Sequence, residues 1–116
     1  MKTIGQISTH VIDTGSGLPA AGLRVRLEYQ ETGQWEIWAE ALSDDAGRVT
    51  GLVGPDRLLR AGIYRLVFDT ALYFRQQRSD CFFCEVQSVF EVCQPDQHYH
   101  IPLLLGPHSY TIYRGR

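Results

Sequence analysis

Apolar and polar residues alternate with a period of two along much of this chain, and this pattern constrains the fold more than any other feature. Residues 23–30 show it most clearly: Leu23, Val25, Leu27 and Tyr29 face one way, and Arg24, Arg26, Glu28 and Gln30 face the other. The alternation predicts a strand with one buried face. Similar but less regular runs occur at 6–12, 35–43, 48–53, 62–69, 86–93, 97–105 and 109–114.

Turn-forming residues separate these runs. Gly, Pro and Asp lie in the intervening segments 14–19, 44–47, 54–56, 94–96 and 106–107. About eight short strands at this spacing predict an all-β sandwich or barrel. One segment departs from the pattern, because Asp69 and Thr70 are good helix caps and residues 71–77 are acceptable helix formers. We therefore expect a single short helix after the fifth strand.

Length and charge exclude several classes of protein. The 116 residues predict one domain spanning 1–116. The net charge of -2 argues against a nucleic acid or a membrane as partner, since either requires a concentrated basic surface. The chain lacks the run of about 18 apolar residues that a membrane span requires. Residues 1–5 lead directly into patterned sequence, so we expect no signal peptide.

The three cysteines, Cys81, Cys84 and Cys93, indicate a reducing compartment. An odd number does not make a closed disulfide framework, and we predict a cytoplasmic protein. Cys81 and Cys84 have CxxC spacing. A redox CxxC is expected beside a βαβ unit, however, and a zinc knuckle requires a second pair of ligands. We interpret these residues as buried or semi-buried free thiols.

Two of the four histidines lie on one predicted strand, 97–105. Its core face should consist of Tyr99, Ile101, Leu103 and Leu105, which leaves His98, His100, Pro102 and Leu104 on the opposite face. The two histidines should therefore point away from the core, toward solvent or another subunit. Proline removes a hydrogen-bond donor from the ladder, so Pro102 should lie near an edge or an irregularity.

Histidines two residues apart on a strand can bind a metal if a third ligand is available. His10, His108, a cysteine or a carboxylate would have to supply it, and the spacing matches no metal signature. Two surface histidines without a role are the simpler interpretation. We predict no metal and no cofactor. The chain also lacks a GxSxG elbow, a phosphate loop, an HExxH motif and a dinucleotide fingerprint.

Three segments taken together resemble the transthyretin-like 5-hydroxyisourate hydrolases. They read ISTHVIDTGSGLPAAG (7–22), DAGRVT (45–50) and QHYHIPLLL (97–105), and the chain closes with YRG (113–115). Their order and separations resemble those of the family along essentially the whole chain. The resemblance implies a transthyretin-like sandwich of two four-stranded sheets. It also implies a homotetramer with active sites in a central channel between dimers.

The resemblance assigns the family's functional residues to positions in this sequence. It implies a catalytic set of His10, Arg48 and His100, with Tyr113, Arg114 and Gly115 as the tail that shapes the substrate pocket. His98 shares a strand face with His100 and should support it. The implied reaction is hydrolysis of the cyclic amide of 5-hydroxyisourate to 2-oxo-4-hydroxy-4-carboxy-5-ureidoimidazoline in urate catabolism. The histidines would transfer protons and Arg48 would stabilise negative charge; the sequence does not decide which histidine activates the water.

Two alternatives remain open. A non-catalytic transthyretin-like carrier would hold a small ligand in the same channel, but would not need this set of histidines and arginines. A structural or interaction module attached to a larger enzyme would not be expected to match the family at both ends. The chain also departs from the family where Arg116 replaces the usual terminal Ser, Cys84 replaces Pro, and residues 106–109 read GPHS. Of these, Arg116 bears most on activity.

Overall fold

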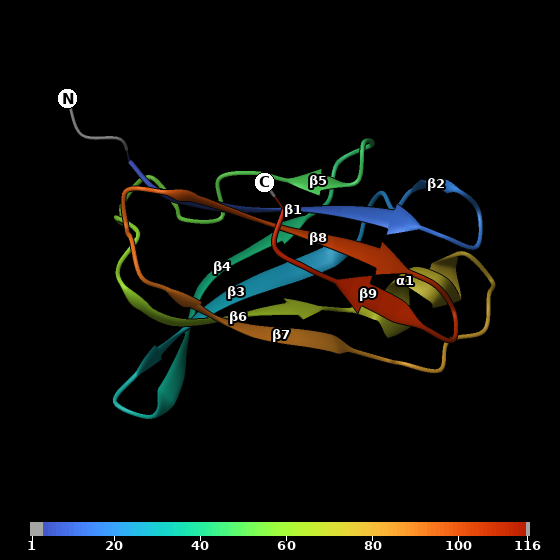
Figure 1. Ribbon diagram of the computed structural model, residues 1–116. Coiled ribbons are helices and arrows are strands. Elements are labelled where there is room, and N and C mark those ends of the chain that lie inside the picture. The colour runs from blue at the N-terminus through green and yellow to red at the C-terminus, as the bar shows by residue number, and fades with distance from the viewer. Residues whose placement is uncertain (1–3, 116) are drawn as a thin grey trace.

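The protein is a β-sandwich with one short helix, as a computed structural model that describes residues 4–115 shows (Figure 1). One sheet has the order β2-β1-β8-β9, with β5 also paired to β1. Its strands are β1 (Gln6–Asp13), β2 (Leu18–Pro19), β5 (Arg48–Val49), β8 (His98–Leu105) and β9 (Tyr110–Ile112). The other sheet has the order β4-β3-β6-β7. Its strands are β3 (Arg24–Glu31), β4 (Gln34–Leu42), β6 (Gly62–Phe68) and β7 (Val86–Val92).

The predicted transthyretin-like all-β class is confirmed, with two local corrections. The segment 14–19, predicted as a turn, contains the two-residue strand β2, which pairs with the end of β1. The first sheet therefore has five strands rather than four. The strand predicted at 48–53 ends at Val49, because Gly51 adopts a φ of 65° and turns the chain out of the sheet.

Both sheets contribute apolar side chains to a shared core. The predicted inner faces of residues 23–30 and 97–105 are buried: Leu23, Val25, Leu27, Tyr29, Tyr99, Ile101, Leu103 and Leu105. On the outer face of β3, Glu28 was predicted to face solvent but is only 4% exposed. It is covered by Arg26 and Arg65, whose guanidinium nitrogens approach its carboxylate oxygens at 2.7 and 2.5 Å. This pairing offsets the cost of burying the charge.

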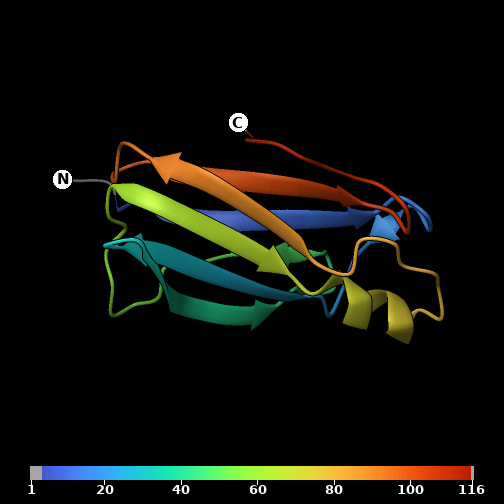
Figure 2. The ribbon, with the colours of Figure 1, turned by 90° about the horizontal axis from the view of Figure 1, so that it is seen from below.

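The helix α1 (Thr70–Gln76) lies at one end of the sandwich (Figure 2). It begins one residue before the predicted range because Asp69, the expected cap, accepts a hydrogen bond from the Leu72 amide at 3.1 Å. Tyr73 ties the helix to the first sheet, since its hydroxyl donates to Asp13 Oδ2 at 2.8 Å. Burial, together with this carboxylate, raises the pKa of Tyr73.

The strands β1 and β8 run parallel, side by side, in the middle of the first sheet (Figure 1). Their register places Gln6 opposite His98, Ser8 opposite His100, and His10 opposite Pro102. Side chains of residues that are paired in register on two neighbouring strands point to the same side of the sheet. His10 on β1 and the two histidines of β8 therefore share the outer face.

Pro102 lies where the ladder between β8 and the C-terminal segment is interrupted. The regular pairing of β9 ends at Leu103–Ile112. On the other side of Pro102, β8 and the C-terminal segment pair again at an isolated bridge between His100 and Gly115. Pro102 has no N–H to donate, although its carbonyl still accepts from the Tyr113 amide at 3.3 Å. This is the irregularity that the sequence predicts.

The cysteines differ in exposure. All three are free thiols; Cys81 is half-buried, as predicted, but Cys84 and Cys93 are exposed. The exposed positions correct the prediction for Cys84, because the loop before β7 presents that residue to solvent. In residues 4–115 the structure has no helix long and apolar enough to cross a membrane.

A tight turn holds β5 against β1. Asp44 Oδ1 accepts hydrogen bonds from the amides of Ala46 and Arg48, both at 2.9 Å. The next residue after Ala46, Gly47, has a φ of 76°, and its carbonyl accepts from the Val11 amide at 2.8 Å. A Cβ at Gly47 would lie 2.3 Å from the Val11 carbonyl oxygen. The turn therefore requires glycine for its conformation and for space.

We expect Gly47→Ala to lower the free energy of unfolding by more than about 2 kcal/mol, because backbone strain and a backbone clash add together. Gly51→Ala is the matched control, since Gly51 has a similar φ but no atom within 4 Å of an added Cβ. It should cost only about 1 kcal/mol. Urea denaturation of both variants tests this. Equal losses of unfolding free energy would show that the contact between Gly47 and the Val11 carbonyl does not add to the cost.

Candidate active site

Ser8 joins the two histidines of β8 on the outer face of the first sheet. Its Oγ lies 2.6 Å from His98 Nε2 and 2.8 Å from His100 Nδ1. The Ser8 residue is 4% exposed, while His100 is half-buried and His98 is exposed. One buried hydroxyl therefore fixes the orientation of both imidazole rings.

His10 and Arg48 lie next to each other through the pairing of β1 with β5. His10 Nε2 is 2.9 Å from the carbonyl oxygen of Ala46. A carbonyl only accepts hydrogen bonds, so Nε2 must bear the proton and Nδ1 is left for another partner. The turn at 44–47 thus fixes the tautomer of His10 as well as the position of Arg48.

Most of these residues, though not His10, line a shallow hollow of about 250 Å³ on the outer face. Its lining consists of Ser8, Thr9, Arg48, Thr50, His98 and His100. The hollow is open to solvent and combines a fixed cation with imidazole nitrogens. Such a set can bind an anionic polar molecule and transfer protons.

The electrostatics of the hollow keep His100 neutral. Burial is the main cause that lowers the pKa of His100, and His98, His10 and Arg48 lower it further. Each of these effects disfavours a positive charge on the ring. Because the ordinary pKa of histidine is about 6.5, His100 is unprotonated at neutral pH and is able to accept a proton.

The C-terminal segment packs against His100. The Gly115 amide donates to the His100 carbonyl at 2.7 Å. A Cβ at Gly115 would lie 2.9 Å from His100 Cδ2 and 3.1 Å from Pro102 Cγ. Glycine is therefore required for the tail to lie flat on the imidazole ring.

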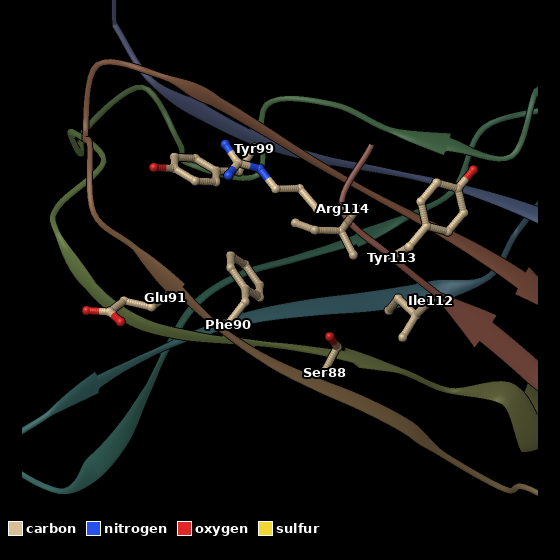
Figure 3. A pocket seen from close by; sticks show the side chains of 8 residues that line it. Ser88, Phe90, Glu91, Tyr99, Ile112, Tyr113 and Arg114 are labelled. Atoms are coloured by element: carbon tan, nitrogen blue, oxygen red, sulfur yellow. The ribbon is translucent and has the colours of Figure 1, made fainter. Parts of the chain in front are cut away.

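Arg114 is directed away from the hollow. Its guanidinium lies over the Tyr99 ring, 4.7 Å from the centroid, and Nη2 donates to Gln97 Oε1 at 3.3 Å. Figure 3 shows Arg114 extending toward Tyr99 while Tyr113 points in another direction. Both residues line a second hollow of about 170 Å³ beside Phe90 of β7. Tyr113 is 51% exposed.

The structure thus brings together His10, Arg48, His98, His100 and Gly115, and separates Arg114 from them. Arg116, whose substitution the sequence singled out, lies outside the described residues.

Sequence reasoning missed Ser8. The sequence pattern could have indicated Ser8 as a site residue, because Ser8 and His10 are two residues apart and share a strand face. In the described part of the chain, no three His, Cys, Asp or Glu side chains form a cluster that could hold a metal ion.

The two-sheet sandwich with an outer face of histidine and arginine defines a transthyretin-like protein with a polar site. Residues 7–115 match the model of the HIUase/Transthyretin family. The chain belongs to this family.

Similar proteins of known name match nearly the whole chain. The 5-hydroxyisourate hydrolase of Mus musculus is 41% identical over 111 residues, which cover 94% of this chain and 93% of the relative. The structure of Klebsiella pneumoniae 5-hydroxyisourate hydrolase aligns with a TM-score of 0.84 at 29% identity, covering 97% of this chain and 100% of that one. Sea bream transthyretin in complex with thyroxine aligns with a TM-score of 0.88 at 29% identity, covering 94% and 93%. The fold is therefore common to hydrolases and to a thyroxine-binding protein.

We expect Gly115→Ala to displace either the tail or the His100 ring, because the added methyl group has no space between them. The His100 side-chain signals in a ¹H–¹⁵N NMR spectrum should shift. The thermal midpoint should change little, since the contact lies on the surface of the sheet. Gly54→Ala is the control, as nothing lies within 4 Å of its added Cβ and its φ is not positive. Unchanged His100 signals in the Gly115 variant would contradict this packing.

Proposed function

We propose that this chain hydrolyses the cyclic amide of 5-hydroxyisourate in urate catabolism. The observation on which this rests is the outer-face set of His10, Arg48 and His100 with the His98–Ser8 pair, in a chain 41% identical to a mouse 5-hydroxyisourate hydrolase. The shared core of the two sheets supports a single domain over 1–116. A cytoplasmic location remains a prediction.

In the proposed mechanism, His100 is the general base. The low pKa of its ring keeps it neutral, and its Nδ1 is occupied by Ser8, so Nε2 is the nitrogen that takes a proton from the attacking water. The oxygen of that water bonds to the lactam carbonyl carbon. The ring C–N bond then breaks, and a proton is delivered to the leaving nitrogen.

Arg48 acts on the negative charge that develops on the substrate, and His10 acts as an acceptor. The Arg48 guanidinium is a cation with several N–H donors, so it binds the anionic substrate and stabilises the oxyanion of the tetrahedral intermediate. His10 donates from Nε2 to the Ala46 carbonyl, which leaves its Nδ1 as an acceptor, and we assign it to accepting a hydrogen bond or a proton from the substrate. The step requires no metal in this scheme.

The tail residues Tyr113, Arg114 and Gly115 remain proposed substrate-binding residues. Gly115 supports this most directly, because it lies against His100. The Arg114 guanidinium is stacked on Tyr99, so a direct contact with substrate in the same hollow would require its side chain to swing away. A contact with the site of a neighbouring subunit is the arrangement that the resemblance implies.

We also propose a homotetramer with the sites between dimers. The apolar residues Leu104 and Tyr113 support an interface near the site, because 36% and 51% of their surfaces stay exposed to solvent in a single chain. Sedimentation equilibrium should give a mass four times the 13.2 kDa of the chain. A stable monomer at micromolar concentration would contradict this.

The function is tested by generating 5-hydroxyisourate from urate with urate oxidase and following its ultraviolet decay. The protein should accelerate the decay over the spontaneous rate. His100→Ala should lower turnover by about 100-fold or more, as expected for loss of a general base. His108→Ala is the matched control, because His108 is exposed and lines neither hollow.

Full activity in the His100 variant would show that the assignment of the base is wrong. A folded wild-type protein that does not accelerate the decay would instead favour the carrier, a role for which the thyroxine complex of sea bream transthyretin provides the precedent. Arg116→Ser would then be the next variant to assay.

A further inference from the structure

Ser8 has one hydroxyl proton but two imidazole partners. The serine oxygen can donate that proton to only one ring nitrogen and must accept from the other. When both rings are neutral, two arrangements satisfy both bonds. Either both rings bear their proton on Nδ1, or both bear it on Nε2. A mixed pair leaves one of the two short contacts without a hydrogen.

We infer that Ser8 is a positioning residue that couples the tautomers of His98 and His100 and relays a proton between them. The inference rests on the proposed hydrolysis for its use in catalysis, but the coupling itself is a property of the free protein. No other hydrogen-bond partner of the Ser8 hydroxyl occurs in residues 4–115. Its only hydrogen-bonding role there is to connect the two rings.

The proton balance of the relay closes over one turnover. At the start, His100 Nδ1–H donates to Ser8 and the Ser8 hydroxyl donates to His98 Nε2. His100 Nε2 takes a proton from water as the hydroxide bonds to the substrate carbonyl. The Nδ1 proton then passes to Ser8 as the Ser8 proton passes to His98, which leaves His98 positive and His100 neutral.

The return half of the cycle delivers the proton to the leaving group. His100 donates its Nε2 proton to the ring nitrogen of the substrate as the C–N bond breaks. At the same time His98 returns a proton to Ser8, and Ser8 returns one to His100 Nδ1. The site is then back in its starting state, and the two parts of one water molecule have been added across the amide bond.

The relay moves the positive charge from His100 to His98, where the charge is more stable. Among residues 4–115, the titratable and charged groups that face His100 are His98 on its own strand, His10 on β1 and Arg48 on β5. Within a single chain, His100 is half-buried among them, whereas His98 is exposed. A charge is more stable where water solvates it. Transfer to His98 therefore lowers the cost of having taken the proton.

Histidine-selective ¹⁵N NMR tests the coupling without substrate. At about pH 8.5, two units above the ordinary pKa of histidine, His98 and His100 should both bear their proton on Nδ1 in the wild-type protein, the pair of tautomers with which the relay starts. Ser8→Ala should remove this correlation, and Ser8→Thr should restore it because the hydroxyl is retained. Ser43→Ala is the matched control, since Ser43 is a buried serine with two backbone hydrogen bonds far from the rings. Opposite tautomers in the wild type would overturn the inference.

Kinetics test the relay. Ser8→Ala should lower kcat about 100-fold and leave KM within about twofold, because the hydroxyl acts in proton transfer and not in binding. Adding Ser8→Ala to His98→Ala should cause no further loss, since both variants interrupt the same path. Additive losses, or full activity of Ser8→Ala, would refute the relay. If the wild-type protein itself is inactive on 5-hydroxyisourate, the proposed function fails, while the NMR result still decides whether the rings are coupled.

Discussion

The parallel pairing of β1 with β8 is the contact on which the candidate site depends. It joins the beginning of the chain to residues 98–105 and runs the full length of both strands. Its register alone decides that Ser8 lies opposite His100, within reach of both imidazole rings. A shift by one residue would turn Ser8 toward the core and Thr9 toward the histidines. The buried face of each strand prevents that shift, because Ile7, Val11 and Leu103 are fully buried.

The sandwich provides rigidity, and its outer face provides the chemistry. Sea bream transthyretin has nearly the same backbone, so the fold does not decide between binding and hydrolysis. What distinguishes a hydrolytic site is a neutral imidazole beside a fixed cation. In this chain burial, together with His98, His10 and Arg48, lowers the pKa of His100. A tight turn that holds β5 against β1 fixes the backbone of Arg48. The turn itself requires glycine at position 47.

Much of the fold was predictable from local pattern. The alternation at 23–30 and 97–105 identified the buried faces, and Asp69 identified the start of the helix. The strand β2 was not predicted, because two residues are too few to show an alternation. Burial of Glu28 was not predicted either, since it depends on Arg65, a residue of a different strand. Long-range pairing of this kind leaves no local signal in the sequence.

The sequence by itself determined the class of fold, the residues on the histidine face and, through resemblance, the family. These follow from periodicity and motifs, which are local properties of the chain. Only the tertiary structure decided that Ser8 bridges His98 and His100, that Gly115 lies on the His100 ring, and that Arg114 stacks on Tyr99. Each of these depends on which strands are neighbours and in what register. Register is set by the packing of both sheets at once, so no single segment of the sequence specifies it.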